Sequence, residues 1–327
     1  MSGEFDGYLE GYRLSILECG HCSLRFSDRL DVPENLYDMI YRHNAVLPGY
    51  NRYAGYATAV TRHPRPLDLL ASSELAYWYV RDHIVNRSGS DVTVIDFGCG
   101  EGYLTYALRQ AGIECTGIDI STTTIHRARQ RFGHDEWFLT TEEFGALPER
   151  QADVVIALEL VEHVAEPVRL LKDAIAAVKQ DGAVLMTTPN RDASPADSVW
   201  DTDLPPVHLL WFNVRSLREL AVRAGCEVSF PPVPESVVKT LRTGTTRDGM
   251  WPPPLTATGD PSVAVRRAHS LPWRIRRRVA RSLTGFSGFL EQSPFRQIPG
   301  PDRPAQPTTL GALFTPRAGQ SADRAAR

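Results

Sequence analysis

Four side chains that can move protons or bind a cation lie in the second half of the chain. The apolar run ADVVIALE ends at Glu159, and Glu162 and His163 follow three and four positions later, on one side if that turn is helical. The fourth side chain, His208, lies in the Pro-rich stretch DLPPVHLLWFN. Imidazoles accept protons near neutral pH, and two carboxylates with two imidazoles suit a divalent cation. We expect these four residues to converge beside a bound substrate.

A glycine-rich turn follows an earlier apolar run. The segment VTVID leads into FGCGEG and then into the helical pattern YLTYALRQAG, so Gly98, Gly100 and Gly102 fall where a strand turns into a helix. Glycines allow a ligand to approach backbone N–H groups, which favours a carboxylate or a phosphate. The spacing differs from the G-x-G-x-x-G of dinucleotide folds, and Asp96 suits an amino group better than a pyrophosphate. The turn therefore predicts a site for a zwitterionic amino-acid group.

A second acidic residue ends the next strand-like run, CTGIDI. Asp119 comes about 20 residues after the glycine turn, where a carboxylate at the edge of a sheet can accept both hydroxyls of a ribose. The turn and this residue together predict a ligand that contains both an amino acid and an adenosine.

The elements that must position these residues alternate along the chain. The expected strands are VTVIDFG, ECTGIDI, EWFLT, ADVVIALE, GAVLMTT, residues 226–230 and TTLGALFTPR, and the expected helices cover residues 67–87, 103–111, 122–132, 166–179 and 216–224. Nearly continuous apolar strands alternating with helices are typical of a parallel sheet covered on both faces. We predict an α/β, doubly wound, Rossmann-like fold.

Three of these motifs, in this order, resemble the successive motifs of class I S-adenosylmethionine-dependent methyltransferases. They are DFGCGEG, GIDIS and ALELVEHVAEP, and the resemblance covers roughly residues 91–231. It implies a seven-stranded, mostly parallel sheet with S-adenosylmethionine as methyl donor. Asp96, Gly98 and Gly100 would then hold the methionine part, Asp119 the ribose and Ile120 the adenine face. For the adenine amino group the resemblance leaves Thr141, Glu142 or a backbone group open.

The E-x-x-E-H element resembles that of small-RNA 2'-O-methyltransferases and ubiquinone-biosynthesis O-methyltransferases. There this element and a later His hold a metal beside the acceptor oxygens, which here implies Glu159, Glu162, His163 and His208 as ligands of Mg²⁺, Mn²⁺ or Zn²⁺. Many metal-free relatives also carry an EH pair. In that case His163 or His208 acts as the catalytic base with Glu162 beside it, or the imidazoles are merely packed in the core.

Composition limits the classes of methyl acceptor and the cellular compartment that we expect. A net charge of −3 gives no general attraction to nucleic acid, and no stretch approaches the roughly 20 apolar residues of a membrane span. The first 18 residues carry four acidic residues and one Arg, unlike a secretory signal, so we expect a cytoplasmic protein. Five scattered cysteines favour reduced thiols. The sequence leaves the oligomeric state open.

Two flanking motifs allow a functional and a structural interpretation. Cys19 and Cys22 invite a zinc site, similar to the N-terminal zinc module of sugar C-methyltransferases, but the chain has no second C-x-x-C pair, which favours a hairpin without zinc. The run from Arg274 to Arg281 holds five arginines, which suits either a solvated helix face or contact with a phosphorylated substrate.

We predict the following division of the chain: an N-terminal helical and aromatic extension over residues 1–66, a methyltransferase core over 67–231, a late insertion with a basic helix over 232–306, a last core strand over 307–317 and a disordered tail over 318–327. The Tyr-rich segment from residue 34 to 57 is either a substrate lid or a helix pair that covers the sheet, or both.

The predicted function is methylation of a hydroxyl on a small molecule, such as a sugar, a secondary metabolite or a nucleotide-linked compound, in natural-product biosynthesis. The alternatives are N-methylation of a sugar amine, 2'-O-methylation of RNA, and a non-catalytic subunit that only binds the cofactor.

Overall fold

The computed structural model of this chain describes most of the core and parts of the flanking segments. The described residues are 5–33, 35–47, 49–87, 92–145, 152–193, 199–200, 204–241, 246–247, 253–263, 265 and 307–317. The basic run from Arg274 to Arg281 and the tail over residues 318–327 lie outside them, so the predictions for those segments stay untested.

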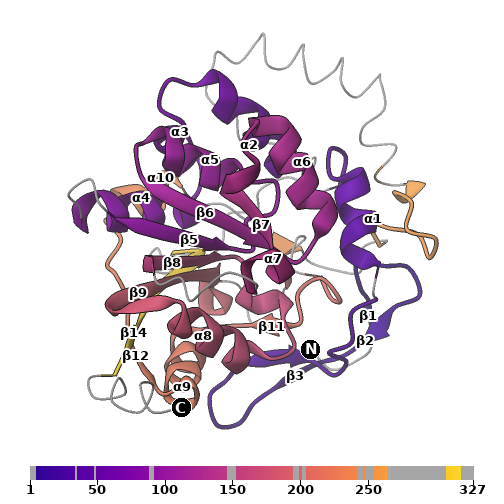
Figure 1. Cartoon of the computed structure of the whole chain (residues 1–327). Coiled ribbons are helices and arrows are strands. Elements are labelled where there is room, and N and C mark those ends of the chain that lie inside the picture. The colour runs from indigo at the N-terminus through magenta and orange to yellow at the C-terminus, as the bar shows by residue number, and fades with distance from the viewer. Residues whose placement is uncertain are drawn as a thin grey trace.

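A seven-stranded mixed sheet forms the centre of the molecule (Figure 1). Its order is β12-β14-β9-β8-β5-β6-β7, and its central strands pair in parallel, whereas β14 is antiparallel to both of its neighbours. The strands are β5 (Thr93–Phe97), β6 (Glu114–Asp119), β7 (Phe138–Thr140), β8 (Ala152–Leu158), β9 (Val178–Pro189), β12 (Cys226–Ser229) and β14 (Thr309–Pro316). The predicted α/β fold with a mostly parallel seven-stranded sheet is confirmed.

Two hydrophobic clusters cover the two faces of this sheet. Because successive side chains of a strand point to opposite faces, Val154 and Ile156 of β8 pack in one cluster and Val155 and Ala157 in the other. The first cluster includes residues of α5 (Tyr103–Gln110) and α6 (Thr122–Phe132), and the second includes residues of α8 (Pro167–Ala176) and α9 (Val214–Ala224). Helices on both faces make the sheet doubly wound.

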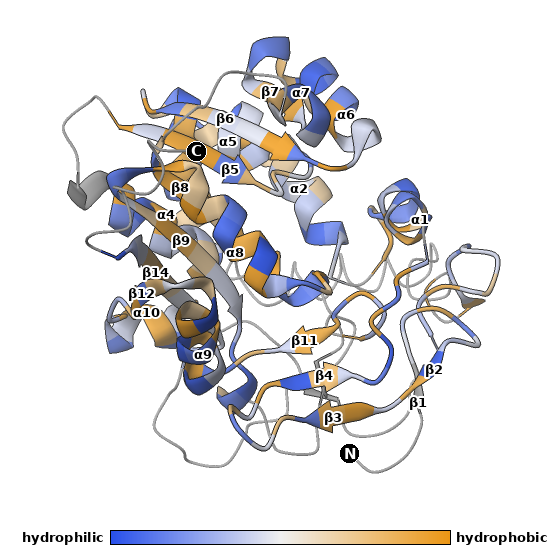
Figure 2. Ribbon diagram, turned by 60° about the horizontal axis from the view of Figure 1, so that its bottom comes forward, coloured by the Kyte–Doolittle hydropathy of each residue, from blue (hydrophilic) through white to orange (hydrophobic). Residues whose placement is uncertain are grey.

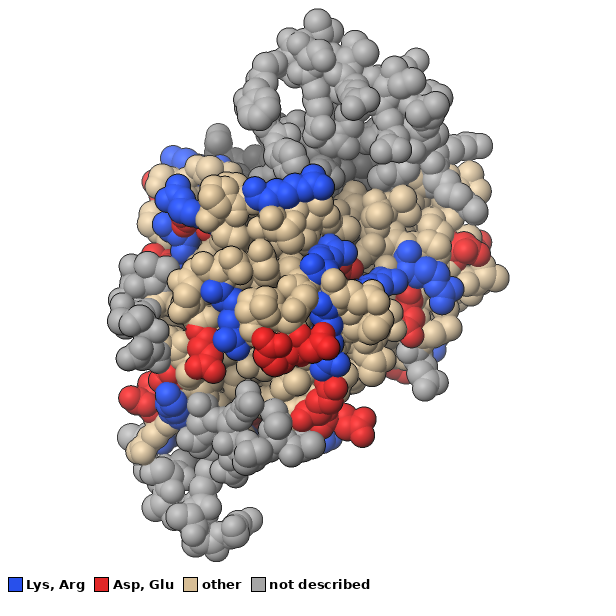
Figure 3. Space-filling view, turned by 45° about the horizontal axis from the view of Figure 1, so that its top comes forward, with Lys and Arg blue, Asp and Glu red and all other residues tan. Residues whose placement is uncertain are grey.

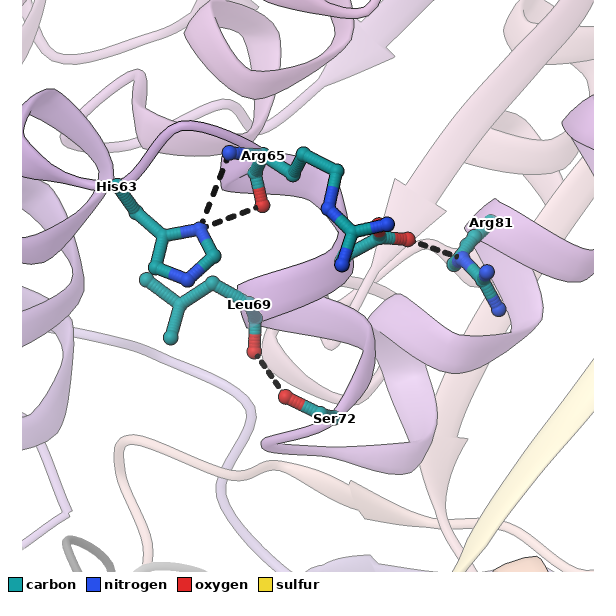
Figure 4. A network of polar contacts seen from close by, with 6 residues as sticks. His63, Arg65, Leu69, Ser72 and Arg81 are labelled. Carbon is teal, nitrogen blue, oxygen red and sulfur yellow. Dashed lines mark hydrogen bonds and ion pairs between the residues drawn. The ribbon is translucent and has the colours of Figure 1, made fainter.

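The prediction of one helix over residues 67–87 is wrong, since two helices form there. They are α3 (Pro66–Ala71) and α4 (Leu75–Arg87). The hydroxyl of Ser72 donates to the carbonyl of Leu69 at 2.9 Å, and such local bonding by serine competes with helix continuation. Across the break, Nε of Arg81 donates to Oδ1 of Asp68 at 2.6 Å (Figure 4).

The N-terminal segment builds a cap beside the large sheet. It contributes short strands and two helices: β1 (Phe5–Asp6), β2 (Arg13–Leu14), β3 (Ile16–Glu18), β4 (Arg25–Ser27), α1 (Leu36–His43) and α2 (Asn51–Ala59). Figure 2 shows β3 and β4 side by side with β11 (Leu210–Trp211), to which β4 pairs antiparallel. The small sheet thereby joins the N-terminal cap to the segment that follows His208.

Described parts of the late insertion pack against both the core and the cap. Val238 and Leu241, at and after α10 (Glu235–Thr240), are buried, and Leu241 belongs to the first hydrophobic cluster. Leu255 belongs to a third cluster that holds Tyr8 and Leu36 of the cap, and its N–H donates to the carbonyl of Tyr8 at 3.1 Å. Among the described residues, no helix is both long and apolar enough to cross a bilayer.

Candidate functional site

The glycine turn sits between β5 and α5, and its backbone is left-handed at three glycines. Gly98, Gly100 and Gly102 have φ values of 74°, 51° and 74°, which residues other than glycine rarely adopt. The N–H groups of Gly98 and Cys99 both donate to the carbonyl of Ile118 on β6, at 2.8 and 3.0 Å. These bonds hold the turn over the ends of two neighbouring strands.

Asp96 lies buried near the end of β5, with 3% of its surface exposed. Its Oδ2 accepts a hydrogen bond from the hydroxyl of Thr105 at 2.8 Å. Burial raises the pKa of Asp96 to about 7, the bond from Thr105 lowers it, and the nearby charge of Asp119 raises it further. A cationic amino group beside this carboxylate would relieve the cost of burying its charge.

Asp119 ends β6 and joins the two sides of the turn. Its Oδ2 accepts from the N–H of Gly100 and its Oδ1 from the N–H of Ser121, each at 2.9 Å. Burial raises the pKa of Asp119, and the two backbone bonds lower it. The carboxylate is thus fixed at the carboxyl edge of the sheet, where it suits a ribose.

The two residues predicted to contact the adenine are both exposed. Ile120 follows Asp119 and is 83% exposed, so it offers an apolar face at the edge of the sheet. Glu142 lies exposed in α7 (Thr141–Gly145), which starts directly after β7. Their roles in binding the adenine stay predictions.

Three polar side chains gather after β8. Glu162 and His163 lie in a short 3-10 helix, Val161–His163, and His208 joins them from the stretch before β11. One possible ligand atom from each of the three lies within 4.8 Å of the others, and Glu162 is fully buried. The N–H of Leu209, the residue after His208, donates to the carbonyl of Glu162 at 2.8 Å, which brings the two segments together.

Glu159 does not belong to this group, which corrects the expectation of four converging side chains. It has a left-handed φ of 48°, so the turn after β8 does not continue as an α-helix from Glu159. Its Oε1 accepts from the hydroxyl of Thr187 on β9 at 2.9 Å, and its N–H donates to the carbonyl of the same residue at 3.0 Å. Pairing with β9 therefore holds Glu159.

Hydrogen bonding and burial set the protonation states of His163 and His208. Nδ1 of His163 donates to the carbonyl of Val207 at 2.7 Å, so in the neutral ring Nε2 carries the lone pair. Burial and the nearby His208 lower the pKa of His163 to about 3, against the opposing effect of the Val207 and Glu159 carbonyls. Burial and the charge of Arg52 lower the pKa of His208 to about 3. Both rings are neutral at pH 7 and can act as acceptors or ligands.

Arg52 is a residue near the cluster that the sequence analysis missed. Its Nε lies 2.9 Å from Oε1 of Glu74, its terminal N–H donates to the hydroxyl of Tyr53 at 2.8 Å, and its charge acts on His208. The available signal was its position between Tyr50 and Tyr53, as a basic residue inside the Tyr-rich segment. It ties the cap to the core beside His208.

The Cys19–Cys22 segment forms a hairpin loop between β3 and β4. Nε2 of His21 lies 3.2 Å from Oε2 of Glu219 on α9, and all five cysteines are free. Within the described part of the chain, the group of Glu162, His163 and His208 is the only cluster of three or more such side chains close enough to share an ion, and it contains neither cysteine. The loop therefore shows no four-ligand zinc site.

Comparison with known families agrees with the motif order and the sheet topology. Residues 57–229, more than half of the chain, match the family described as "Methyltransferase domain". The chain belongs to this methyltransferase family. Its fold is that of the class I, S-adenosylmethionine-dependent enzymes, with the donor implied by the family as S-adenosylmethionine.

The relatives of this methyltransferase cover only part of its length. A "Probable S-adenosylmethionine-dependent methyltransferase" of Mycolicibacterium smegmatis is 29% identical over 163 residues, 48% of this chain and 62% of the relative. A "Ubiquinone biosynthesis O-methyltransferase" of Stutzerimonas stutzeri is 36% identical over 104 residues, 30% of this chain and 45% of the relative. The chain thus spans less than two thirds of these relatives.

Solved structures of methyltransferases resemble this chain with lower sequence identity than these relatives. The structure of a SAM-dependent methyltransferase from Archaeoglobus fulgidus matches 76% of this chain and 93% of that one, with 16% identity and a TM-score of 0.41.

Proposed function

We propose that this protein transfers the methyl group of S-adenosylmethionine to a hydroxyl oxygen of a small molecule. The observation that supports this most is the gathering of Glu162, His163 and His208 at the carboxyl edge of the sheet. Asp96, the glycine turn over residues 98–102 and Asp119 together form what we call the cofactor cradle. The cluster lies beside the cradle, since Leu160, next in space to Gly98, is followed by the 3-10 helix that carries two of the three residues.

The donor would lie along the carboxyl ends of β5 and β6. The amino group of its methionine part faces Asp96, and its ribose hydroxyls bind Asp119. The left-handed glycines keep this approach open. An added Cβ on Gly98 would lie 3.1 Å from the methyl groups of Leu160, tighter than ordinary contact.

The acceptor would lie over the polar cluster. Its oxygen attacks the methyl carbon in line with the departing sulfur, the carbon–sulfur bond breaks, and S-adenosylhomocysteine leaves as a thioether. The hydroxyl proton passes to Nε2 of His163, whose Nδ1 is held by Val207. Because the ring is neutral, Nε2 has the free lone pair that this step requires.

As an alternative to proton uptake by His163, the same three side chains fit a divalent cation, which Nε2 of His163 would then bind. A carboxylate and two imidazoles are suitable ligands for Mn²⁺ or Zn²⁺ and, with added water, for Mg²⁺. The Nδ1 bond of His163 to a backbone carbonyl is the support that metal-bound histidines usually have. When bound, the cation would lower the pKa of the acceptor hydroxyl.

Surface charge agrees with a small acceptor. On the face drawn in Figure 3, basic and acidic side chains lie interspersed over the described residues, and the chain as a whole carries a charge of −3. A nucleic acid would instead favour a continuous basic surface.

The experiment that tests this proposal supplies S-adenosylmethionine with an isotopically labelled methyl group. The purified protein is incubated with a panel of phenols, catechols and sugars, and with the matching amino compounds, and the products are analysed by mass spectrometry. We expect label on the hydroxyl compounds. Label only on the amino compounds, or on RNA added in a parallel reaction, would contradict O-methylation, and cofactor binding without transfer to any compound would favour a non-catalytic subunit.

A further inference from the structure

Helix α1 presents two different faces to its surroundings. Leu36 and Ile40, four positions apart, are fully buried in the third hydrophobic cluster of the cap. Tyr37 and Tyr41 share the adjacent face, and an added Cβ on Gly100 would lie 3.6 Å from the hydroxyl of Tyr41. The tyrosine face of α1 therefore lies over the cradle.

Two hydrogen bonds hold α1 in this position. The side chain of Asn44, just after the helix, donates to Oε1 of Glu101 at 2.9 Å, and Arg127 of α6 donates to the carbonyl of Tyr41 at 3.1 Å. Glu101 directly follows Gly100 and is itself paired with Arg131 at 3.2 Å. The helix is thus fastened to the glycine turn, which fixes the place of Tyr37 relative to the donor.

Tyr37 stands between the donor and acceptor parts of the site. Its ring meets the ring of His163 edge to face, with centroids 6.2 Å apart. Burial raises the pKa of Tyr37 above its usual value, and the charges of Glu162 and Asp119 raise it further. The charges of Glu162 on the acceptor side and of Asp119 on the donor side thus both act on its hydroxyl, which keeps its proton at neutral pH.

The hydroxyl of Tyr37 is buried and has no hydrogen-bond partner among the residues that the structure describes. A buried hydroxyl without a partner costs about 1–3 kcal/mol, so such groups are rare unless a ligand or water completes them. The other tyrosines of the cap include one that is satisfied within the fold: the hydroxyl of Tyr56 donates to Oε1 of Glu74 at 2.7 Å. Tyr37 is available for a ligand in a way that Tyr56 is not.

We propose that the hydroxyl of Tyr37 binds the methyl acceptor at the point of transfer. The inference rests on the proposed function, because it assigns a ligand to the same site. An acceptor oxygen has one proton and two lone pairs. The proton points to Nε2 of His163, one lone pair attacks the methyl group, and the second lone pair accepts a hydrogen bond from Tyr37. All three directions at the oxygen then have a defined partner.

The first test measures binding and needs no acceptor. Sinefungin is an analogue of S-adenosylmethionine in which an amine stands at the place of the transferred methyl group, whereas S-adenosylhomocysteine has nothing there. We expect Tyr37→Phe to raise the Kd of sinefungin roughly five- to tenfold, because the amine loses a hydrogen bond to the phenol oxygen. The Kd of S-adenosylhomocysteine should stay within about twofold of the wild-type value. Both Kd values are measured by calorimetry.

Tyr56→Phe is the matched control, since it removes a cap hydroxyl with a partner inside the fold. It should lower the melting temperature and leave the ratio of the two Kd values unchanged. Tyr37→Phe should not lower the melting temperature, because its hydroxyl makes no bond within the described fold. Equal changes in both Kd values, or no change in either, would overturn the proposal.

The second test uses whichever hydroxyl compound the labelled-methyl panel identifies. Tyr37→Phe should lower kcat at least tenfold with an unchanged KM for S-adenosylmethionine, and an unchanged kcat would contradict the role. If the panel yields no hydroxyl acceptor, the proposed function fails, while the sinefungin comparison still decides whether Tyr37 reaches the transfer point.

Discussion

His163 and His208 meet edge to face, with ring centroids 4.5 Å apart and an interplanar angle of 78°. The two residues come from segments that are distant in the sequence, one after β8 and one before β11. The bond from the N–H of Leu209 to the carbonyl of Glu162 brings these segments together. Two neutral imidazoles beside a buried carboxylate are an arrangement that can take up a proton or bind a cation.

The first prediction concerns the ribose contact. Asp119→Ala should raise the Kd of S-adenosylmethionine roughly 30- to 100-fold, because both ribose bonds and the bond that fixes Gly100 are lost. Asp153→Ala is the matched control. Its carboxylate accepts from Thr93 and pairs with Lys179 at the opposite edge of the sheet, so stability should fall without a specific loss of binding. Calorimetry on both variants measures the difference.

A second prediction follows from the buried carboxyl of Asp96, whose pKa is raised to about 7 from an ordinary value of 3.8. Between these two values the folded protein binds more protons than the unfolded chain, so the free energy of unfolding should fall as pH rises from about 4 to 7. Asp96→Asn should flatten this slope. Urea unfolding of both proteins at several pH values measures this slope. An equally steep slope in Asp96→Asn would contradict the assignment of the slope to the carboxyl of Asp96.

The same carboxyl predicts the pH dependence of donor binding. The ammonium of S-adenosylmethionine favours the ionised form of Asp96, so affinity should rise as pH increases through about 7. In Asp96→Asn the affinity should be roughly tenfold weaker at pH 8 and should lose this dependence. Titrations with the donor from pH 6 to 8 measure both effects.

A third prediction concerns the last glycine of the turn. Gly102→Ala should destabilise the protein by about 2–4 kcal/mol, because the new Cβ would lie 2.6 Å from the buried ring of Phe138 and the φ of 74° disfavours a side chain. Gly112→Ala has a similar φ of 81° but no atom within 4 Å, so it should cost only about 1 kcal/mol. Denaturant unfolding of both variants separates the clash with Phe138 from the backbone effect. An equal loss in the free energy of unfolding in both variants would contradict the role of the clash.

Much of the core could be predicted from the sequence because its strands are buried on both faces. Apolar runs such as VTVID and ADVVIALE leave little choice of structure, and the last core strand, β14, forms at Thr309–Pro316 as expected. The break between α3 and α4 escaped prediction because Ser72 ends the helix through a local hydrogen bond that the apolar spacing does not show.

The candidate site was predictable only in part, for a different reason. Residues at the end of a strand or in the turn after it, such as Asp119 and His163, are placed largely by that strand. The meeting of His208 with His163 depends on the pairing of β11 with β4 and on Leu209, which no local pattern reveals. Glu159 lies outside the group of Glu162, His163 and His208, and its left-handed backbone and its bonds to Thr187 depend on the neighbouring strand.

A fourth prediction tests the cation. If Nε2 of His163 takes the proton itself, methyl transfer should be unchanged by EDTA and by added Mg²⁺, Mn²⁺ or Zn²⁺. A loss of at least tenfold that one of these ions restores, with an unchanged Kd of S-adenosylmethionine, would contradict the direct base and assign Nε2 to a cation.

The most direct test of the account is turnover by the variant His163→Ala/His208→Ala. We expect methyl transfer to fall at least 100-fold while the Kd of S-adenosylmethionine stays within about threefold of wild type, because the cluster serves the acceptor and the cradle serves the donor. His63→Ala is the control, since His63 contacts Arg65 outside the cluster (Figure 4). Unchanged turnover in the double variant would contradict the central claim.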